Sequence, residues 1–173
     1  MKSAAYRFAR STRAALAAAF LLVAATAAAP AGDPPRLMVF DTEFVDLMMS
    51  GTGETFTTAE DVSRAKEISS AFRKQMAGRY QIVTPKTDIP YDLTCPECIL
   101  KIARAQKASL VLTSALSRLN SNNVILKYEL DDVASEKALK TGSIRLNGYT
   151  ARQIRMATDT AVKDLNTESA AKE

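Results

Sequence analysis

Both cysteines of the chain fall in one short stretch, and this stretch constrains the fold more than any other feature. It begins with Cys95-Pro96-Glu97-Cys98 and runs through an amphipathic segment into the apolar run Leu110–Leu116. Pro96 suits the first position of a helix, where its missing N–H costs nothing. The spacing therefore predicts a short helix over 96–106 that the cysteine pair opens, followed by a strand over 109–119.

Residues 1–31 have the order of a secretory signal peptide. A basic start without acidic residues is followed by an apolar run over 14–25 and by small residues that end at Ala29-Pro30-Ala31. Cleavage after Ala31 fits the small-residue rule, and so does cleavage near Ala28. The alternative is an uncleaved anchor, but the apolar run is shorter than the about 20 residues that span a bilayer. We therefore expect export to the periplasm and no stable membrane insertion after cleavage.

The positive charge of the chain belongs to this first segment. The full sequence has 23 Lys+Arg and 19 Asp+Glu, a net charge of +4. Because residues 1–31 hold four of the basic residues and none of the acidic ones, the remaining chain has a net charge of zero. Nucleic-acid binding would require a basic patch on the mature domain, so we expect no nucleic-acid partner.

The sequence contains no histidine and no tryptophan. The missing histidine removes Ser-His-Asp and Cys-His catalytic sets and most zinc or copper sites. Carboxylates are the other candidates for chemistry, and they gather at Asp41, Glu43 and Asp46 and again at Asp131-Asp132. Such residues can hold Mg²⁺ or Ca²⁺, but at strand ends they are usually solvated turn residues. We therefore predict no catalytic residue, no metal and no cofactor.

Hydrophobic periodicity predicts the remaining elements. Strands are expected over 36–41, with an extension through 43–45, and over 79–84, 124–130 and 138–147. In the expected strand 124–130, apolar Leu126, Tyr128 and Leu130 alternate with Lys127 and Glu129, which predicts one wet face. Helices are expected over 58–77 and 150–166; the first begins at Thr57 or Thr58 and places on the core the stripe Val62, Ala65, Ile68, Phe72 and Met76.

The expected order is β-α-β-α-β-β-β-α. Strands joined through helices favour parallel neighbours, and strands joined by short turns favour antiparallel hairpins. The sequence thus predicts a single α/β domain (α+β mixed) over 32–166, with a mixed sheet covered by helices and a disordered polar tail over 167–173.

The segment between the first strand and the first helix is expected to be a long loop. It carries Met48, Met49 and Phe56, and exposed side chains of this kind on a loop are adaptable binders. We name these three residues as a candidate interaction loop. The alternative is that Met48 and Phe56 pack back onto the core.

The cysteine pair has a structural and a catalytic interpretation. In an oxidising compartment, two cysteines at this spacing are expected to be bonded, which predicts a Cys95–Cys98 disulfide. The alternative is a periplasmic thiol-disulfide oxidoreductase, because Cys-x-x-Cys at a helix N-terminus is the spacing that such enzymes use. Glu97 between the sulfurs and the missing aromatic residue before Cys95 favour the structural interpretation.

The chain also resembles an uncharacterised family of secreted proteobacterial proteins, a domain of unknown function of the DUF3280/DUF2380 type. The matching segments are Leu37–Asp41, Cys95–Cys98 with Ile102-Ala103 and Leu110–Leu112, Ser117–Leu119 leading into Val124–Leu126, and Asn147–Thr150. Lys107-Ala108-Ser109 stands where a glycine-containing turn is expected.

The element order is similar to that of three periplasmic α/β domains: the N-terminal domain of TolB, the core of the curli secretion lipoprotein, and the lipoprotein activators of penicillin-binding proteins. Those domains bind other proteins and catalyse nothing. The resemblance therefore implies a non-catalytic accessory module whose partner is another periplasmic or envelope protein.

Overall fold

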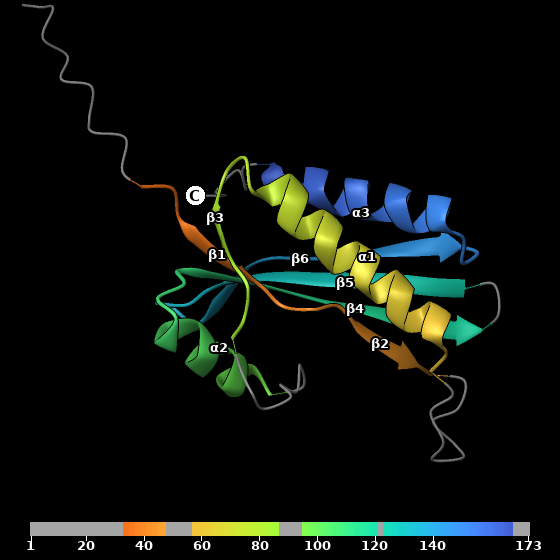
Figure 1. Cartoon of the computed structure of the whole chain (residues 1–173), viewed down its shortest axis with the longest axis horizontal. Coiled ribbons are helices and arrows are strands. Elements are labelled where there is room, and N and C mark those ends of the chain that lie inside the picture. The colour runs from red at the N-terminus through yellow and green to blue at the C-terminus, as the bar shows by residue number, and fades with distance from the viewer. Residues whose placement is uncertain (1–32, 48–56, 87–94, 121–122, 168–173) are drawn as a thin grey trace, which may run out of the picture. The chain divides into compact units, whose positions relative to one another are not determined.

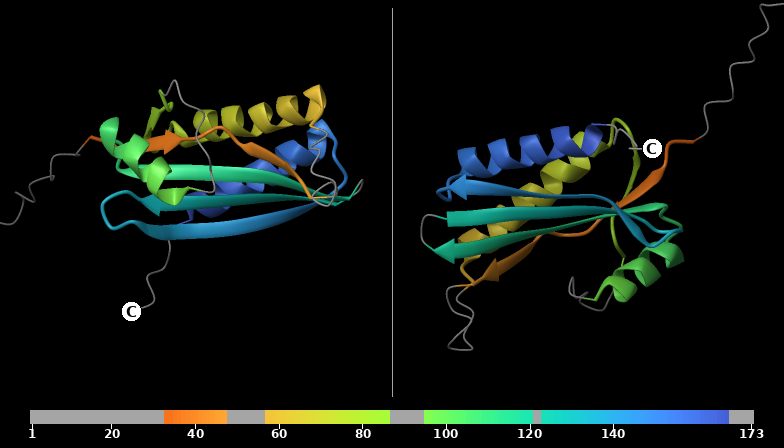
Figure 2. Two further views of the ribbon diagram at one scale, coloured as in Figure 1. Left: turned by 90° about the horizontal axis from the view of Figure 1, so that it is seen from below. Right: turned by 180° about the vertical axis from the view of Figure 1, so that it is seen from behind.

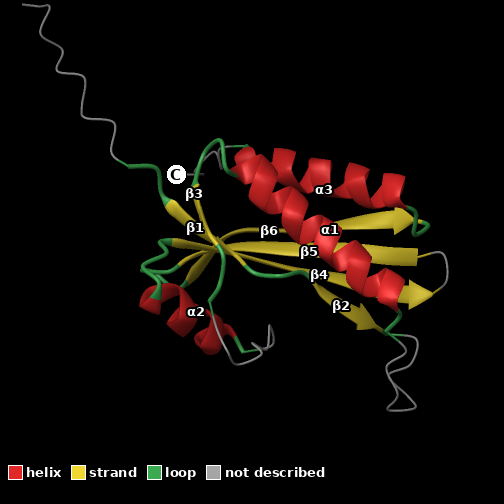
Figure 3. Cartoon of the chain, viewed as in Figure 1, coloured by secondary structure: helices red, strands yellow, loops and turns green. Residues whose placement is uncertain are grey.

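Six strands form one mixed sheet in the order β3-β1-β4-β5-β6, with β2 beside β4 (Figure 1). The computed structural model describes residues 33–47, 57–86, 95–120 and 123–167. Its strands are β1 (Arg36–Val39), β2 (Glu43–Asp46), β3 (Gln81–Val83), β4 (Leu110–Asn120), β5 (Asn123–Asp132) and β6 (Lys137–Asn147). Its helices are α1 (Ala59–Met76), α2 (Pro96–Ala105) and α3 (Ala151–Asn166) (Figure 3).

The directions of the strands follow their connections. β1 and β3, which are linked through α1, pair in parallel, and β1 and β2 both pair in parallel with β4. The consecutive strands β4, β5 and β6 form an antiparallel meander. The predicted α/β class, the mixed sheet and the element order are confirmed, with the first strand divided in two.

The helices cover the two faces of the sheet unequally. α1 and α3 lie side by side over one face, where Phe72 and Met76 pack with Leu112, Leu126 and other buried side chains. α2 packs on the opposite face, where Ile99 and Ala103 meet Met38, Phe40 and Val111. Figures 1 and 2 show α2 beside one end of the strands only. One face is thus covered along its length and the other at one end.

α1 begins with a capping box at Thr58, one of the two predicted start residues. Thr58 is the N-cap, and its side chain accepts a hydrogen bond from the backbone N–H of Asp61, whose carboxylate accepts from the Thr58 N–H. The prediction that Val62 lies in the core is wrong, since this residue is 43% exposed. Asp61, one residue earlier, is buried in its place because Arg118 lies opposite it.

The first strand is interrupted where the chain crosses beneath α1. β1 ends at Val39, and β2 begins at Glu43. Between them, the buried Thr42 donates its backbone N–H to the Ser69 hydroxyl of α1 at 2.7 Å. Thr42 and Ser114 also share a hydrogen bond between their hydroxyls at 2.8 Å. These side-chain partners replace the ladder bonds that a continuous strand would have made.

α2 ends in a Schellman turn in which a lysine takes the glycine position. The Ala108 N–H donates to the Ala103 carbonyl at 2.9 Å, and the Lys107 N–H donates to the Arg104 carbonyl at 3.0 Å. Lys107 has a φ of 57°, in the left-handed region that glycine usually occupies. The turn expected between helix and strand is therefore present, without its glycine.

Three predicted segments lie outside the described residues: the signal peptide over 1–31, the candidate interaction loop with Met48, Met49 and Phe56, and the tail beyond Thr167. They stay predictions. Within the described parts of the chain, every helix is too short or too polar to cross a membrane.

Candidate functional site

The part of the sheet that α2 leaves uncovered is the candidate site. α2 contacts the beginning of β4 through Val111, and the buried cluster on this side also takes in Val133 after β5. The next outward-facing positions of β4, β5 and β6 carry polar side chains. We call the side chains of Glu43, Thr113, Ala115, Lys127, Glu129, Thr141 and Ser143 the open face.

The register of the sheet arranges the open face in two rows. In one row, Glu129 lies between Thr113 of β4 and Thr141 of β6. In the next row, Ala115 pairs with Glu43 of β2 on one side and with Lys127 on the other, and Ser143 follows Lys127. Small and hydroxylated side chains between the charged ones leave a shallow hollow of about 510 Å³.

Along β5, the side chains on this side of the sheet change from basic to acidic. Lys127 and Glu129 are exposed, and Asp131 follows at the end near α2. Burial, together with the neighbouring Glu129 carboxylate, raises the pKa of Asp131 to about 6. Arg145 of β6 pairs with Ile125, beyond Lys127, so Lys127 and Arg145 lie toward one end of β5 and β6, and Glu129 and Asp131 lie toward the other. Glu43 of β2 is the exception, since it lies in the row of Lys127. The face thus presents a mixed polar surface, with opposite charges at fixed places.

Tyr128, between Lys127 and Glu129, points to the other side of the sheet. Its ring lies over Gly142, where an added Cβ would come within 2.2 Å of the ring, and its hydroxyl donates to Asp164 of α3 at 2.9 Å. Burial and this hydrogen bond raise the pKa of Tyr128 to about 12. The contact holds β5, β6 and α3 together behind the open face.

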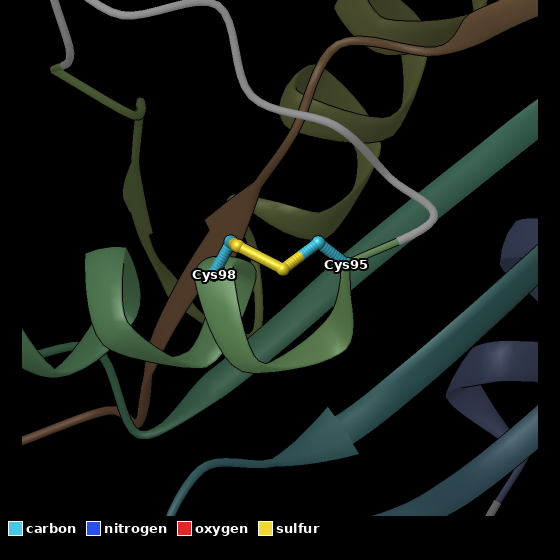
Figure 4. The surroundings of a disulfide bond; sticks show 2 residues. All are labelled: Cys95 and Cys98. Atoms are coloured by element: carbon cyan, nitrogen blue, oxygen red, sulfur yellow. A yellow bond between two sulfur atoms is a disulfide. The ribbon is translucent and has the colours of Figure 1, made fainter.

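The predicted disulfide is present at the start of α2 (Figure 4). Cys95 precedes the helix as its N-cap residue and Cys98 lies in the first turn, with 5.3 Å between their Cα atoms. Cys98 is exposed, and so are Pro96 and Glu97. The disulfide therefore fixes the entry into α2 and lies apart from the open face.

The carboxylates that the sequence singled out do not converge. Asp41 forms an ion pair with Arg73 at 2.5 Å, and Asp46 lies 3.9 Å from Arg118. Asp132 accepts a hydrogen bond from the Ser135 N–H at 2.7 Å, as a turn residue does. Glu43 alone of these joins the open face. Among the described residues, no three cysteine or carboxylate side chains lie close enough together to hold a metal ion.

Sequence patterns predict part of the open face and leave out the rest. The alternation around Lys127 and Glu129 predicted a wet face on β5, and the structure confirms it. Periodicity does not single out Thr113, Thr141 and Ser143, because it does not record how far α2 covers the face of the sheet on which they lie. The available signal is the period of two in the polar residues from Thr141 to Asn147.

Comparison with solved structures gives distant likenesses. The C-terminal domain of LpoB from Salmonella enterica has a TM-score of 0.44 and 16% identity, covering 66% of this chain and 84% of that one. The PelC dodecamer from Paraburkholderia phytofirmans has a TM-score of 0.43 and 17% identity, covering 76% of this chain and 81% of that one. TolB from Acinetobacter baumannii has a TM-score of 0.43 and 13% identity, covering 78% of this chain and 29% of that one.

No curated protein sequence matches the chain. The profile of a family does match, over residues 35–165, which run from β1 to the last but one residue of α3. The segments that carried the resemblance, from Leu37 to Thr150, all fall within this range. The chain therefore belongs to the family DUF3280, described as "Protein of unknown function (DUF2380)".

Proposed function

We propose that this chain is a non-catalytic accessory module of the periplasm that binds another envelope protein through its open face. The observation that carries the proposal is the uneven cover of the sheet. α2 protects one end of the face, and the rows around Lys127 and Glu129 are left to solvent. Interfaces between soluble proteins are about as polar as the rest of the surface, and paired charges set their specificity.

Other carboxylates of the chain are held in ion pairs within the fold, which supports a binding role over a catalytic one. A catalytic carboxylate must be free to exchange a proton with a substrate. Asp41, Asp61 and Asp164 are instead held by Arg73, Arg118 and Lys140. These pairs join helices to strands or, for Asp41, to the connection between β1 and β2, so their contribution is structural. Lys127 and Glu129 of the open face are exposed and take part in none of these pairs.

Site-specific crosslinking in cells tests the proposal. A photoreactive residue at Thr141 places the probe on the open face, and one at Lys66 of α1 serves as the control, because both positions are exposed and only the first lies on the open face. We expect a crosslinked product of one defined mass from position 141 and none from position 66. The same product from both positions, or none from position 141, would overturn the proposal.

Charge reversal makes this test specific. Lys127→Glu removes the basic side chain from the second row and should reduce the crosslinked product about tenfold. Lys101→Glu, on the exposed side of α2, changes the net charge equally and should leave the product unchanged. The melting temperature of each variant reports whether the fold is intact. If both variants reduce the product equally, net charge alone governs the association.

The disulfide variant separates this proposal from the oxidoreductase alternative. Cys95→Ser/Cys98→Ser should keep the crosslink from position 141, because the disulfide lies outside the open face. Reduction of insulin disulfides that required both cysteines would instead support the redox function.

A further inference from the structure

We propose that the outer edge of β6 and the groove between β6 and α3 bind an extended segment of a partner protein, which adds a strand to the sheet. The segment would alternate apolar and acidic residues. This site goes beyond the open face, and binding can fail at either site while it holds at the other.

β6 is a long strand with an unused edge. Among the described residues it pairs with β5 only, and it runs for 11 residues. Alternate residues of such a strand direct their backbone N–H and C=O groups outward, where they form a template for another strand. β3, at the opposite end of the sheet, has 3 residues and offers a much shorter edge. β6 is therefore the edge best able to accept an added strand.

A groove runs beside this edge, between β6 and α3, which lie next to each other in Figure 1. It is lined on the strand side by Ile144 and on the helix side by Met156, Ala157 and Thr160. The Met156 side chain is 59% exposed, the largest exposure among the described large apolar residues. The groove has a volume of about 220 Å³, below the 300–1,000 Å³ of typical small-molecule pockets. Its size suits one or two side chains of a strand.

An unpaired strand beside a helix is a known arrangement for strand addition. Backbone hydrogen bonds then supply affinity, and pockets for alternate side chains supply specificity. A strand added next to β6 would direct every second side chain toward Ile144 and Met156, on the helix side. Apolar side chains fit there. The side chains between them would lie beside Ser143 and Arg145, on the side of the open face.

The charges along β6 select the partner. The strand contains Lys137, Lys140 and Arg145 and no acidic residue. The Lys140 ammonium lies 3.4 Å from the Asp164 carboxylate, so it is compensated. The exposed Arg145 forms no ion pair with any described residue. Because like charges opposite each other destabilise a strand pair, β6 of a second copy is a poor partner, and an acidic strand is a good one.

The probe is a capped peptide of alternating glutamate and valine, about eight residues long, which is an ordinary strand length. Its affinity for the full chain is measured by fluorescence anisotropy, and hydrogen exchange of the β6 amides is followed with and without it. We expect binding together with slower exchange in β6. A peptide with N-methyl groups on alternate amides keeps the side chains but loses backbone donors, and it should not bind.

Two variants and a matched control locate the site. Arg145→Glu should weaken binding of the glutamate–valine peptide about fivefold, since cross-strand charge pairs contribute free energies of this size. The same variant should strengthen binding of a second probe, a capped peptide of alternating lysine and valine. Met156→Ser should weaken both peptides through the groove. Arg155→Glu changes the net charge as Arg145→Glu does, but Arg155 lies on the side of α3 that faces α1, so it should change neither affinity.

Several outcomes would overturn the inference. Equal binding of the N-methylated peptide would mean that no strand is added. Unchanged exchange in β6 would place the peptide elsewhere. Protection of β6 at high protein concentration without peptide, together with a dimer in sedimentation, would identify a second copy as the occupant. If position 141 gave no crosslinked product while the glutamate–valine peptide still bound, the proposed function would be contradicted and this inference would stand.

Discussion

Arg118, near the end of β4, forms an ion pair with Asp61, the capping-box residue of α1. Asp61 is 1% exposed, and Arg118 lies over the neighbouring rings of Phe44 and Tyr149, with its guanidinium carbon 4.8 Å and 5.5 Å from their centroids. Burial opposes ionisation of Asp61, but hydrogen bonds from Thr58 and Arg118 outweigh it and hold the pKa of Asp61 below its usual value. One arginine thus joins α1 to β4 and to the turn before α3.

Arg118→Leu is expected to destabilise the fold by about 3 kcal/mol near neutral pH, because it leaves the Asp61 carboxylate buried without its partner. The measurement is urea unfolding. The loss should shrink as the pH falls through the pKa of Asp61, since a protonated carboxyl needs no counter-charge. Glu60→Ala, which breaks the exposed pair between Glu60 and Arg64, is the control and should cost about 0.5 kcal/mol or less. Equal costs for both variants would show that Arg118–Asp61 behaves as a surface pair.

Gly142→Ala is expected to destabilise the chain by about 2 kcal/mol, because its Cβ would overlap the Tyr128 ring, which the hydrogen bond to Asp164 holds in place. Thermal unfolding measures the change. Ser143→Ala, at the next position and on the open face, should be nearly neutral. In the background of Tyr128→Ala, the cost of Gly142→Ala should largely disappear. A cost that persists there would assign the effect to the backbone of β6.

Local signals in the sequence predicted most of the fold. Thr58 and Thr150 begin helices, Pro96 opens α2, and the alternation around Tyr128 gives β5 its buried and wet sides. These features depend on residues within a few positions of one another. They could be predicted because capping, φ restriction and strand periodicity are local properties.

The failures come from contacts between distant parts of the chain. Asp61 is buried and Val62 exposed because Arg118 lies opposite the first turn of α1, 57 positions away. The extent of the open face depends on how far α2 reaches across the sheet, which no pattern within α2 records. The free edge of β6 depends on the order of the whole sheet. A sequence analysed by periodicity alone contains none of these three relationships.

Lys107→Gly is expected to stabilise the chain by about 0.5–1 kcal/mol. Glycine removes the steric cost that a Cβ brings to the left-handed backbone of the Schellman turn. Its greater conformational freedom in the unfolded chain offsets part of this gain. Lys107→Ala is the matched control: it removes the same charge and keeps the Cβ, so it should bring no gain. Chemical unfolding of both variants gives the difference. If alanine stabilises as much as glycine, the lysine charge, and not the backbone, is responsible.

Asp131→Asn is expected to stabilise the chain above about pH 7 and to have no effect near pH 4. The folded pKa of Asp131, about 6, lies above its ordinary value of 3.8 because of burial and the nearby Glu129. Between these two values the folded chain holds a proton that the unfolded chain has lost, so this residue makes stability fall as the pH rises. Solvent screening at this half-buried site reduces the effect to about 1 kcal/mol.

The control for this prediction is the adjacent Asp132, whose pKa is shifted in the opposite direction by folding. The Ser135 backbone N–H holds the pKa of Asp132 below its usual value, so its contribution is present above pH 3.8 and is lost as the pH falls further. Melting temperatures of Asp131→Asn and Asp132→Asn, measured from about pH 3 to about pH 8, should therefore depart from the parent chain in opposite directions near neutrality. If Asp131→Asn followed the parent at every pH, the Asp131 carboxyl would be solvated and would carry its full charge beside the open face.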